Sequence, residues 1–228
     1  KPDVAAHAHV DADHLLAMQA RLAADPDRFW LEQTHRIAWM KSPTQTVSGD
    51  FNGDVRVKWF EDGVLNASVS CLDRHLARNG DKVAIIWEGD DPNAQEKVTY
   101  RDLYERVCRL ANALKSLGAK KGDRICIYLP MVVEAAVAML ACVRIGAIHS
   151  VVFGGFSPDS LANRIQDAGC RVLITADEGR RGGRKVALKT NADEAVSRCP
   201  TVEHVVVVAV TGGDVPMQEG RDIDYATA

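Results

Sequence analysis

Short apolar runs alternate with segments that carry helix signals along residues 122–210. The apolar runs have the length and continuity of buried strands, and their sequences are "RICIYLP", "AIHSVVF", "CRVLITA" and "VEHVVVVAV". Continuous apolar strands are expected in a parallel sheet that is covered on both faces. The alternation of strand and helix therefore predicts an α/β fold with a doubly wound, largely parallel sheet and flanking helices.

A helix is predicted between successive strands of this sheet. The first covers 131–145 and is ended by Gly146. The second has Ser157 as its N-cap and Pro158 at its first helical position. The third is predicted over "NADEAVSRC". These caps and stops give each strand-to-helix connection a defined boundary.

The segment before the sheet combines helices with a hairpin. "NASVSCLDRHLARNG" predicts a helix with Asn66 or Ser68 as cap and Gly80 as stop, and "KVAIIWEGD" with "KVTY" predicts a hairpin. The helix that follows has Thr99 and Asp102 arranged as a capping box. Its apolar stripe recurs at spacings of three and four, and consists of Leu103, Val107, Leu110, Ala111, Leu114 and Leu117.

The two ends of the chain lack the regular alternation of strand and helix. Residues 11–40 predict helix, interrupted and restarted at Pro26, whereas residues 41–63 predict an irregular connection with short strands. The last segment, "TGGDVPMQEGRDIDYATA", carries no helix or strand signal, so we expect "HVVVVAV" to be poorly covered. We therefore predict an N-terminal extension over 1–63 and, over 64–228, the first part of a larger domain.

Composition and charge exclude several classes of function. The formal net charge is −3, which argues against a general nucleic-acid binder. The longest apolar run, 131–143, is too short to cross a membrane and contains Glu134, and the polar start lacks a signal peptide. None of the six cysteines forms a C-x-x-C pair, which favours reduced, buried thiols over zinc or disulfides. A cytoplasmic protein without a resident metal is the expectation.

One stretch concentrates positive charge in this slightly acidic chain. "TADEGRRGGRK" (175–185) contains four basic side chains and three glycines, and "FGGFS" (153–157) contains two further glycines. Both follow predicted strands, where ligands bind in open α/β sheets. Glycine backbone and arginine forks suit phosphate, so these segments indicate a site for a nucleotide-like anion.

Other interpretations of these segments remain open. The arginine-glycine stretch is also compatible with a solvated surface loop or an RNA contact, and "FGGFS" with a plain strand-to-helix turn. The pairs Asp90-Asp91 and Asp177-Glu178 are interpreted as turn residues. No G-x-S-x-G, H-E-x-x-H or P-loop lysine is present in the sequence, so no catalytic residue is assigned.

Several segments together resemble a known family. They are "CLDRHL", "KVAIIWEGD", "TYRDLYERVCRLANALKSLGAKKGDRICIYLPM", "RIGAIHSVVFGGFS" and "TADEGRRGGR". They resemble the AMP-forming acetyl-CoA synthetases, which are adenylate-forming enzymes related to firefly luciferase. The resemblance covers nearly the whole chain, with "VKWFEDGVLNAS" similar to that family's N-terminal region.

The resemblance implies an acetate–CoA ligase that uses ATP, Mg²⁺ and coenzyme A. Acetate and ATP would give acetyl-adenylate and diphosphate, and CoA would then displace AMP. By the same resemblance Arg181 and Arg184 contact the nucleotide end of CoA, with Gly182 and Gly183 between them. Phe153–Gly155 match a turn near the CoA path, and no role is carried over to Arg180.

Several motifs of the family have no match in this sequence. The family's Ser/Thr/Gly-rich phosphate loop, its ribose-binding aspartate and its catalytic lysine have no match in the sequence, so the chain alone is expected to be inactive. Its partners would be small molecules, with no nucleic acid, no membrane and an open oligomeric state. Two alternatives remain: part of a propionyl-CoA synthetase, or a non-catalytic α/β binding module.

Overall fold

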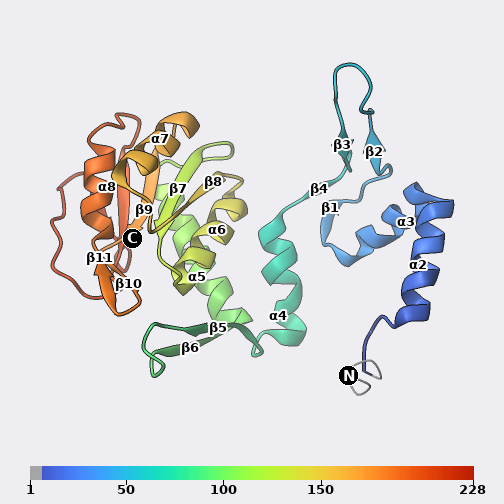
Figure 1. The fold of residues 1–228 in the computed structure, drawn as a ribbon, viewed down its shortest axis with the longest axis horizontal. Coiled ribbons are helices and arrows are strands. Elements are labelled where there is room, and N and C mark those ends of the chain that lie inside the picture. Colours follow the sequence, from blue (N-terminus) through green and yellow to red (C-terminus); the bar gives the residue numbers. More distant parts are fainter. Residues whose placement is uncertain (1–6) are drawn as a thin grey trace. The chain divides into compact units, whose positions relative to one another are not determined.

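The computed structural model describes residues 7–228 and divides the chain between Asn66 and Ala67 into two compact units (Figure 1). The second unit, 67–228, is built on a five-stranded sheet in the order β13-β12-β9-β7-β8. Every pairing in this sheet is parallel. Its strands are β7 (Arg124–Leu129), β8 (Ile148–Phe153), β9 (Val172–Ala176), β12 (His204–Val208) and β13 (Asp222–Asp224).

Helices cover both faces of this sheet. The chain steps from β7 outward to β8 and then returns across β7 to β9 and β12. Because parallel crossovers are right-handed, this reversal places α6 on one face and α7 and α8 on the other (Figure 1). Helix α5 packs against α6. The helices are α5 (Tyr100–Ser116), α6 (Val133–Ile145), α7 (Pro158–Ala168) and α8 (Leu188–Val196). The predicted doubly wound α/β fold is confirmed.

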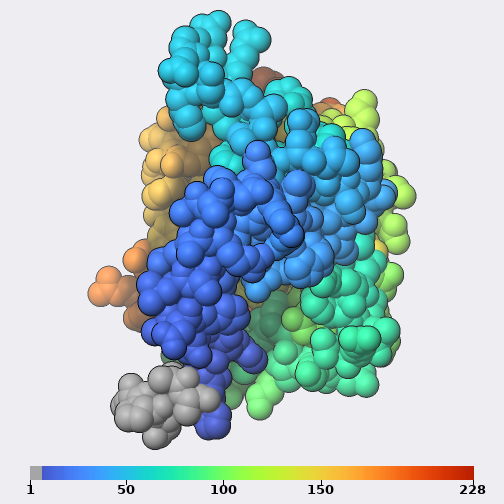
Figure 2. Space-filling view, turned by 90° about the vertical axis from the view of Figure 1, so that its right-hand side faces the viewer, coloured from blue at the N-terminus to red at the C-terminus, as the bar shows by residue number. Residues whose placement is uncertain are grey.

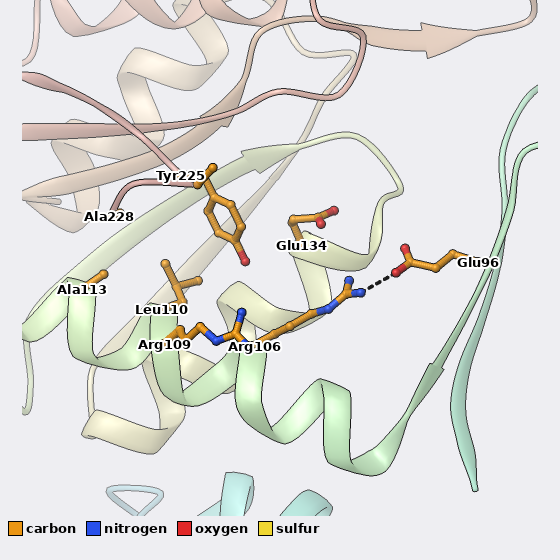
Figure 3. A pocket seen from close by; sticks show the side chains of 9 residues that line it. Glu96, Arg106, Arg109, Leu110, Ala113, Glu134, Tyr225 and Ala228 are labelled. Atoms are coloured by element: carbon orange, nitrogen blue, oxygen red, sulfur yellow. Dashed lines mark hydrogen bonds and ion pairs between the residues drawn. The ribbon is translucent and has the colours of Figure 1, made fainter. Parts of the chain in front are cut away.

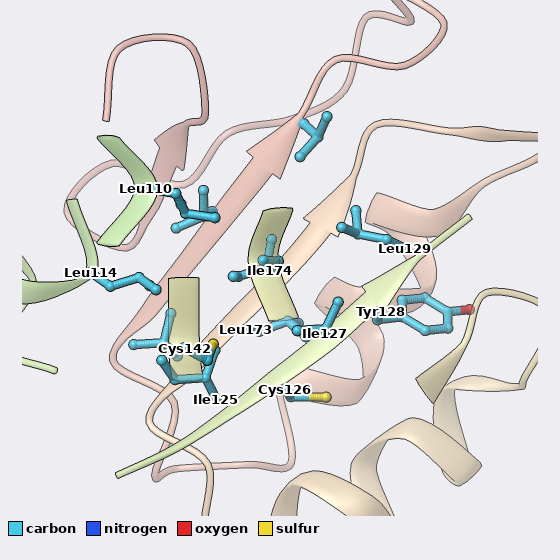
Figure 4. Close-up of a cluster of buried hydrophobic side chains, with 14 of the residues drawn as sticks. Leu110, Leu114, Ile125, Cys126, Ile127, Tyr128, Leu129, Cys142, Leu173 and Ile174 are labelled. Carbon is cyan, nitrogen blue, oxygen red and sulfur yellow. The ribbon is translucent and has the colours of Figure 1, made fainter. Parts of the chain in front are cut away.

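The core lies between the central strands and these helices (Figure 4). Ile125 and Ile127 of β7 and Leu173 and Ile174 of β9 are fully buried. All but the last residue of the predicted stripe on α5 is buried, and Leu117 packs against the same core. Apolar residues on two neighbouring strands and on a helix above them thus supply one continuous core.

The predicted helix boundaries in this unit are largely confirmed. Thr99 and Asp102 form the capping box of α5, and Ser157 caps α7 with Pro158 at its first position. Gly146 ends α6 with a positive φ of 77°, which few other residues adopt without strain. The predicted hairpin is also present, as antiparallel strands β5 (Val83–Glu88) and β6 (Gln95–Thr99).

The helix predicted after residue 66 contains a distortion. It begins with a π-helical segment, η2 (Val69–Asp73), and continues as α4 (Arg74–Asn79) to Gly80. Ser68 was predicted as a cap, but it has helical backbone angles and receives a hydrogen bond from the Arg144 Nη1 to its hydroxyl at 3.4 Å. Arg144 also pairs with both oxygens of Asp73 at 2.8 and 2.9 Å. Arg144 thus contacts both ends of the π-helical segment: Ser68 just before it and Asp73 as its last residue.

Two expectations about the sheet are wrong. Strand β8 was expected to be buried, but it lies at the edge of the sheet, where β7 alone among the described strands pairs with it, and it is mostly exposed or half-buried. The final segment does contain a strand: β13 pairs in parallel with β12, and Val205–Val208 are buried. The sequence gives no clear strand signal here, because β13 has three residues, two of them aspartates, and Lys189, which pairs with Asp222, lies far away in the chain.

The first unit, described over residues 7–66, contains two helices and two small antiparallel pairs. Helix α2 (Ala12–Ala24) is capped by Asp11, and α3 (Pro26–Gln33) begins at Pro26 with Asp25 as its cap, as predicted. The other elements are η1 (Thr34–Arg36), β1 (Trp39–Lys41), β2 (Val47–Ser48), β3 (Lys58–Trp59) and β4 (Val64–Leu65). Strand β1 pairs with β4 and β2 with β3, and the loop between β2 and β3 projects from the rest of this unit (Figure 2).

The helix predicted over 11–40 is therefore too long. It stops at a 3₁₀ turn because the Trp39 indole N–H donates to the Thr34 carbonyl at 2.9 Å and the chain then enters β1. Phe29 is buried, whereas Trp30 and Ile37 are exposed. They line an apolar pocket of about 630 Å³ together with Trp39 and Trp59.

The described residues also bear on the cysteines and on membranes. All six thiols are free; Cys126, Cys142, Cys170 and Cys199 are buried, whereas Cys71 is exposed and Cys108 half-buried. Within 7–228, no helix has the length and apolar content needed to cross a bilayer. No cluster of three metal-ligating side chains was found in the same range.

Candidate anion-binding site

The carboxyl ends of β7, β8 and β9 form the edge at which the predicted site lies. The connections that leave β7 and β9 go to opposite faces of the sheet, which makes their junction a topological switch point. Gly179, just after β9, packs so closely here that an added Cβ would lie 3.4 Å from the Cβ of Pro130, which follows β7. The segment after β9 therefore starts at the place where open α/β sheets bind ligands.

That segment is a hairpin and not a loop. Strands β10 (Gly179–Arg181) and β11 (Arg184–Val186) pair antiparallel, and we call residues 179–186 the arginine hairpin. Its two-residue turn has φ values of +56° at Gly182 and +74° at Gly183. Positive φ at both central residues is what a tight type I′ hairpin turn requires, so the glycines serve the turn.

The register of the hairpin sorts its four cations onto two faces. Arg181 lies opposite Arg184, and Arg180 lies opposite Lys185. Side chains alternate along a strand, so Arg181 and Arg184 share one face and the other pair shares the opposite face. All four residues are exposed.

The two faces differ in their counter-charges. Lys185 is paired with Glu178 at 2.6 Å. Among the ion pairs found within residues 7–228, none includes Arg181 or Arg184. Like charges directly opposite on a hairpin repel each other. The Arg181–Arg184 face is therefore a place where an external anion would relieve repulsion.

The structure brings the second predicted segment to the same place. The Arg181 guanidinium carbon lies 5.3 Å from the centre of the Phe153 ring. A Cβ at Gly155 would lie 2.6 Å from that ring and 3.1 Å from the Arg181 Nη1. A Cβ at Gly154 would lie 3.2 Å from the Leu129 carbonyl oxygen. Phe153–Gly155 and Arg181 therefore form one surface, and its glycines allow close approach.

Further aromatic and cationic groups extend this surface. The Phe153 ring meets the Phe156 ring edge to face at 5.9 Å, and the Arg164 guanidinium lies 4.7 Å from the Phe156 ring. The Tyr128 hydroxyl, on β7, donates to the Phe156 carbonyl at 2.8 Å and so holds the turn after β8. The result is a row in which two phenylalanine rings lie between two arginine side chains, and it offers both charge and flat apolar area.

Asp177 and Glu178 lie between the sheet and the hairpin, and they are not turn residues as predicted. Asp177 is 2 % exposed, and its carboxylate accepts hydrogen bonds from the backbone N–H groups of Val210 at 2.8 Å and Gly213 at 3.0 Å. The N–H groups of Thr211 and Glu178 also donate to it. A single buried carboxylate thereby organises residues 210–213, which we call the 210–213 loop.

The pKa values of both carboxyls reflect these partners. Burial works to raise the pKa of Asp177, but the backbone N–H groups outweigh burial and hold it below the ordinary value. The ion pair with Lys185, followed by the hydroxyl of Thr211, lowers the pKa of Glu178. Both groups are therefore charged at neutral pH, and Glu178 connects the hairpin to the 210–213 loop.

A second charge cluster lies beneath α8. Lys189 is fully buried and pairs with Asp193 at 2.7 Å and with Asp222 at 2.8 Å. Arg221 pairs with the same two carboxylates, at 2.5 and 2.6 Å. We call these four residues the α8 network. It ties β13 to α8 and gave no signal in the sequence, because its members are far apart in the chain.

A separate pocket of about 460 Å³ contains none of the predicted site residues (Figure 3). It lies beside α5 and includes the Arg106–Glu96 ion pair at 2.5 Å. Burial, with a smaller effect of Glu134, raises the pKa of Tyr225 in its wall to about 12. Arg106 and Glu96 are already paired with each other, which distinguishes this pocket from the arginine hairpin.

Comparison with known proteins identifies the family. A family model described as "AMP-binding enzyme" matches residues 72–224, more than half of the chain. The chain belongs to the AMP-binding enzyme family. A second model, described as the N-terminus of acetyl-coenzyme A synthetase, matches residues 16–71.

Individual relatives agree with this assignment. An acetyl-coenzyme A synthetase of Nostoc linckia is 71% identical over 177 residues, which are 78% of this chain and 52% of that protein. Another, of Alkalilimnicola ehrlichii, is 59% identical over 223 residues, which are 97% of this chain and 34% of that protein. The chain thus spans about half the length of the first relative and about a third of the second.

A solved structure agrees as well. Acetoacetyl-CoA synthetase from Streptomyces lividans superposes with a TM-score of 0.83 at 25% sequence identity, covering 98% of this chain and 34% of that one. The resemblance to acetyl-CoA synthetases that the sequence motifs indicated is confirmed. The roles of Arg181–Arg184 and Phe153–Gly155 stay predictions.

Proposed function

We propose that this chain provides the CoA-binding edge of an AMP-forming acetate–CoA ligase. The reaction would join ATP, acetate and CoA to give acetyl-CoA, AMP and diphosphate through an acetyl-adenylate. The observation that carries the proposal is the pair Arg181 and Arg184, which face the same way at the carboxyl edge of the sheet without a carboxylate partner.

The arrangement suits the nucleotide end of CoA. Its phosphates are strongly anionic, and guanidinium groups donate forked hydrogen bonds to phosphate oxygens. Its adenine is flat, and the exposed Phe153 ring beside Arg181 gives it an apolar surface to cover. Gly154 and Gly155 would let the bound molecule pass close to the backbone.

The rest of the reaction would rely on groups outside these residues. ATP, Mg²⁺ and acetate are proposed as the other small-molecule ligands of the full-length protein, and the 228-residue chain alone is proposed to form no AMP. Free cysteines fit a reducing compartment, so we place the reaction in the cytoplasm.

The test separates the two half-reactions. In the full-length protein, Arg181→Ala/Arg184→Ala should raise the KM for CoA at least tenfold, because two charge-assisted contacts to phosphate are lost. Acetate-dependent exchange of diphosphate with ATP, which needs no CoA, should stay unchanged. Calorimetry with CoA at low salt should show the same loss of affinity.

The matched control is Arg180→Ala. It removes the same charge from the opposite face of the same hairpin, and it should change the KM for CoA less than about threefold because exposed charges act weakly at a distance. An equal effect of Arg180→Ala would overturn the assignment to one face. A full-length protein without acetate-dependent exchange would overturn the proposed reaction.

A further inference from the structure

The arginine hairpin is not part of the five-stranded sheet. Strands β10 and β11 pair only with each other among the described residues, so no ladder of sheet hydrogen bonds fixes their direction. Few contacts remain that can orient the hairpin. At its base, Gly179 and Val186 pack against the domain. Beyond the base, the Arg181 guanidinium lies against the Phe153 ring, the Gly183 N–H donates to the Asp90 carboxylate at 3.2 Å, and Lys185 pairs with the side chain of Glu178.

Glu178 connects the arginine hairpin to the 210–213 loop. One of its carboxylate oxygens receives the Lys185 ammonium at 2.6 Å, from β11 of the hairpin. The same oxygen accepts a hydrogen bond from the hydroxyl of Thr211. Gly213 fits against this side chain so tightly that an added Cβ would lie 2.8 Å from the Glu178 carboxyl carbon.

The 210–213 loop, in turn, is fixed to the sheet. Its N–H groups are bound by the buried carboxylate of Asp177, and the Asp177 N–H donates to the Val208 carbonyl at 2.9 Å, at the end of β12. A continuous path therefore runs from the core through Asp177, the loop and Glu178 to Lys185. Lys185 lies on the face of the hairpin opposite to Arg181 and Arg184.

We propose that Glu178 is a positioning residue that sets the orientation of the arginine hairpin, and with it the direction of Arg181 and Arg184 toward CoA. This inference rests on the proposed function. Glu178 acts through Lys185 and Thr211 and does not touch the ligand. An anion-binding site gains nothing from a nearby carboxylate by charge alone, so the carboxylate must contribute through geometry.

The two roles predict opposite signs. If Glu178 acted only through its charge, Glu178→Gln would remove a negative group near the site and strengthen CoA binding, whereas Lys185→Met would weaken it. If Glu178 orients the hairpin, both substitutions break the same contact and both weaken binding. The double variant should then be no worse than either single one, because the contact can be lost only once.

The experiment is a double-mutant cycle on the full-length protein. We expect Glu178→Gln and Lys185→Met each to raise the KM for CoA about three- to tenfold with kcat for diphosphate exchange unchanged, and the double variant to stay within about twofold of the single ones. Thr211→Val keeps the backbone N–H that Asp177 binds and removes only the hydroxyl. It should act in the same direction by about two- to fivefold.

Several results would overturn the inference. Tighter or unchanged CoA binding in Glu178→Gln would do so, as would effects of the two substitutions that multiply. Exchange of diphosphate with ATP reports that each variant is folded. Arg181→Ala/Arg184→Ala, measured in the same series, keeps the two proposals apart: if it weakens CoA binding and Glu178→Gln does not, only the positioning role fails.

Discussion

The arginine hairpin and the α8 network use the same kinds of side chain in opposite ways. In the α8 network two cations face two carboxylates, and Lys189 and Asp222 have fully buried side chains. On one face of the hairpin two cations face each other, exposed and without a carboxylate. A charge whose partner is built into the protein serves the fold, whereas a charge that lacks one is available to a ligand.

The cost of burial explains this division. Several kcal/mol are needed to remove one ion from water, so a buried charge persists only with close partners of opposite sign. Exposed arginines keep most of their hydration, so they are stable without a partner and remain free to bind an anion. The two regions are close in sequence, since Lys189 lies only a few residues after Arg184, yet their different burial gives them different roles.

The largest expected effect concerns the α8 network. Lys189→Met keeps the side-chain volume but leaves the buried Asp222 with only Arg221 and the Gln218 N–H. We expect the free energy of unfolding to fall by about 3–5 kcal/mol, because Asp193 and Asp222 are then left with one cation between them. Urea denaturation followed by circular dichroism measures this loss.

Lys185→Met is the matched control for that loss. Lys185 belongs to an ion pair whose lysine side chain is 59 % exposed, so its removal should cost less than about 1 kcal/mol. A similar loss of stability in both lysine variants would contradict the argument that burial, and not pairing alone, decides how much an ion pair contributes to the fold.

The second prediction concerns the pH dependence of Asp177. Its pKa is lower in the folded protein than in the unfolded chain, so its stabilising contribution is present above the unfolded pKa of about 3.9. That contribution is lost as the pH falls through the folded pKa. At pH 7, Asp177→Asn should lower the free energy of unfolding by roughly 2–4 kcal/mol, because backbone N–H groups lose a charged acceptor.

This difference between the wild type and Asp177→Asn should shrink as the pH is lowered below about 4. Urea denaturation at a series of pH values between 7 and 3 would show it. Asp214→Asn, which changes an exposed carboxylate next to the same loop, should have little effect at any pH. A difference for Asp177→Asn that stayed constant over the whole range would show that its charge is not what holds the loop.

The smallest effect is expected at the turn of the hairpin. Gly182 has a φ of +56°, and an added Cβ would meet nothing within 4 Å, so backbone conformation alone limits this position. Gly182→Asn should leave the KM for CoA within about twofold, because asparagine tolerates this region. Gly182→Val should cost about 1–2 kcal/mol in the hairpin and raise that KM several-fold. Equal KM values for both variants would argue that the turn does not align Arg181 with Arg184.

Most of the fold could be predicted from local patterns. Some elements are specified by residues that lie inside or directly beside them. Examples are the caps at Thr99 and Ser157, the stop at Gly146 and the apolar runs of β7, β9 and β12. The exceptions depend on distant partners. Strand β13 is held by Lys189 and Arg221 under α8, and the first unit leaves the helix at Thr34 because of Trp39 and the pairing of β1 with β4.

The site was only partly visible in the sequence for a related reason. Composition marked the arginines and glycines, but it could not show that Arg181 pairs with Arg184 while Arg180 turns away, since this depends on the register across a two-residue turn. Asp177 looked like a turn residue because most of its partners lie more than thirty positions later. Its place directly after a buried apolar strand was the available signal.

The separation of the hairpin from the main sheet has an evolutionary consequence. Residues 180–185 are exposed and contribute nothing to the core, whereas Gly179 at the base is buried against Pro130 and Leu188. Mutations can therefore accumulate in this short segment without endangering folding, and selection can retune the preferred anion there independently of the scaffold. The same boundary makes 180–185 a natural cassette for directed evolution, in which libraries of hairpins could be exchanged on an unchanged domain.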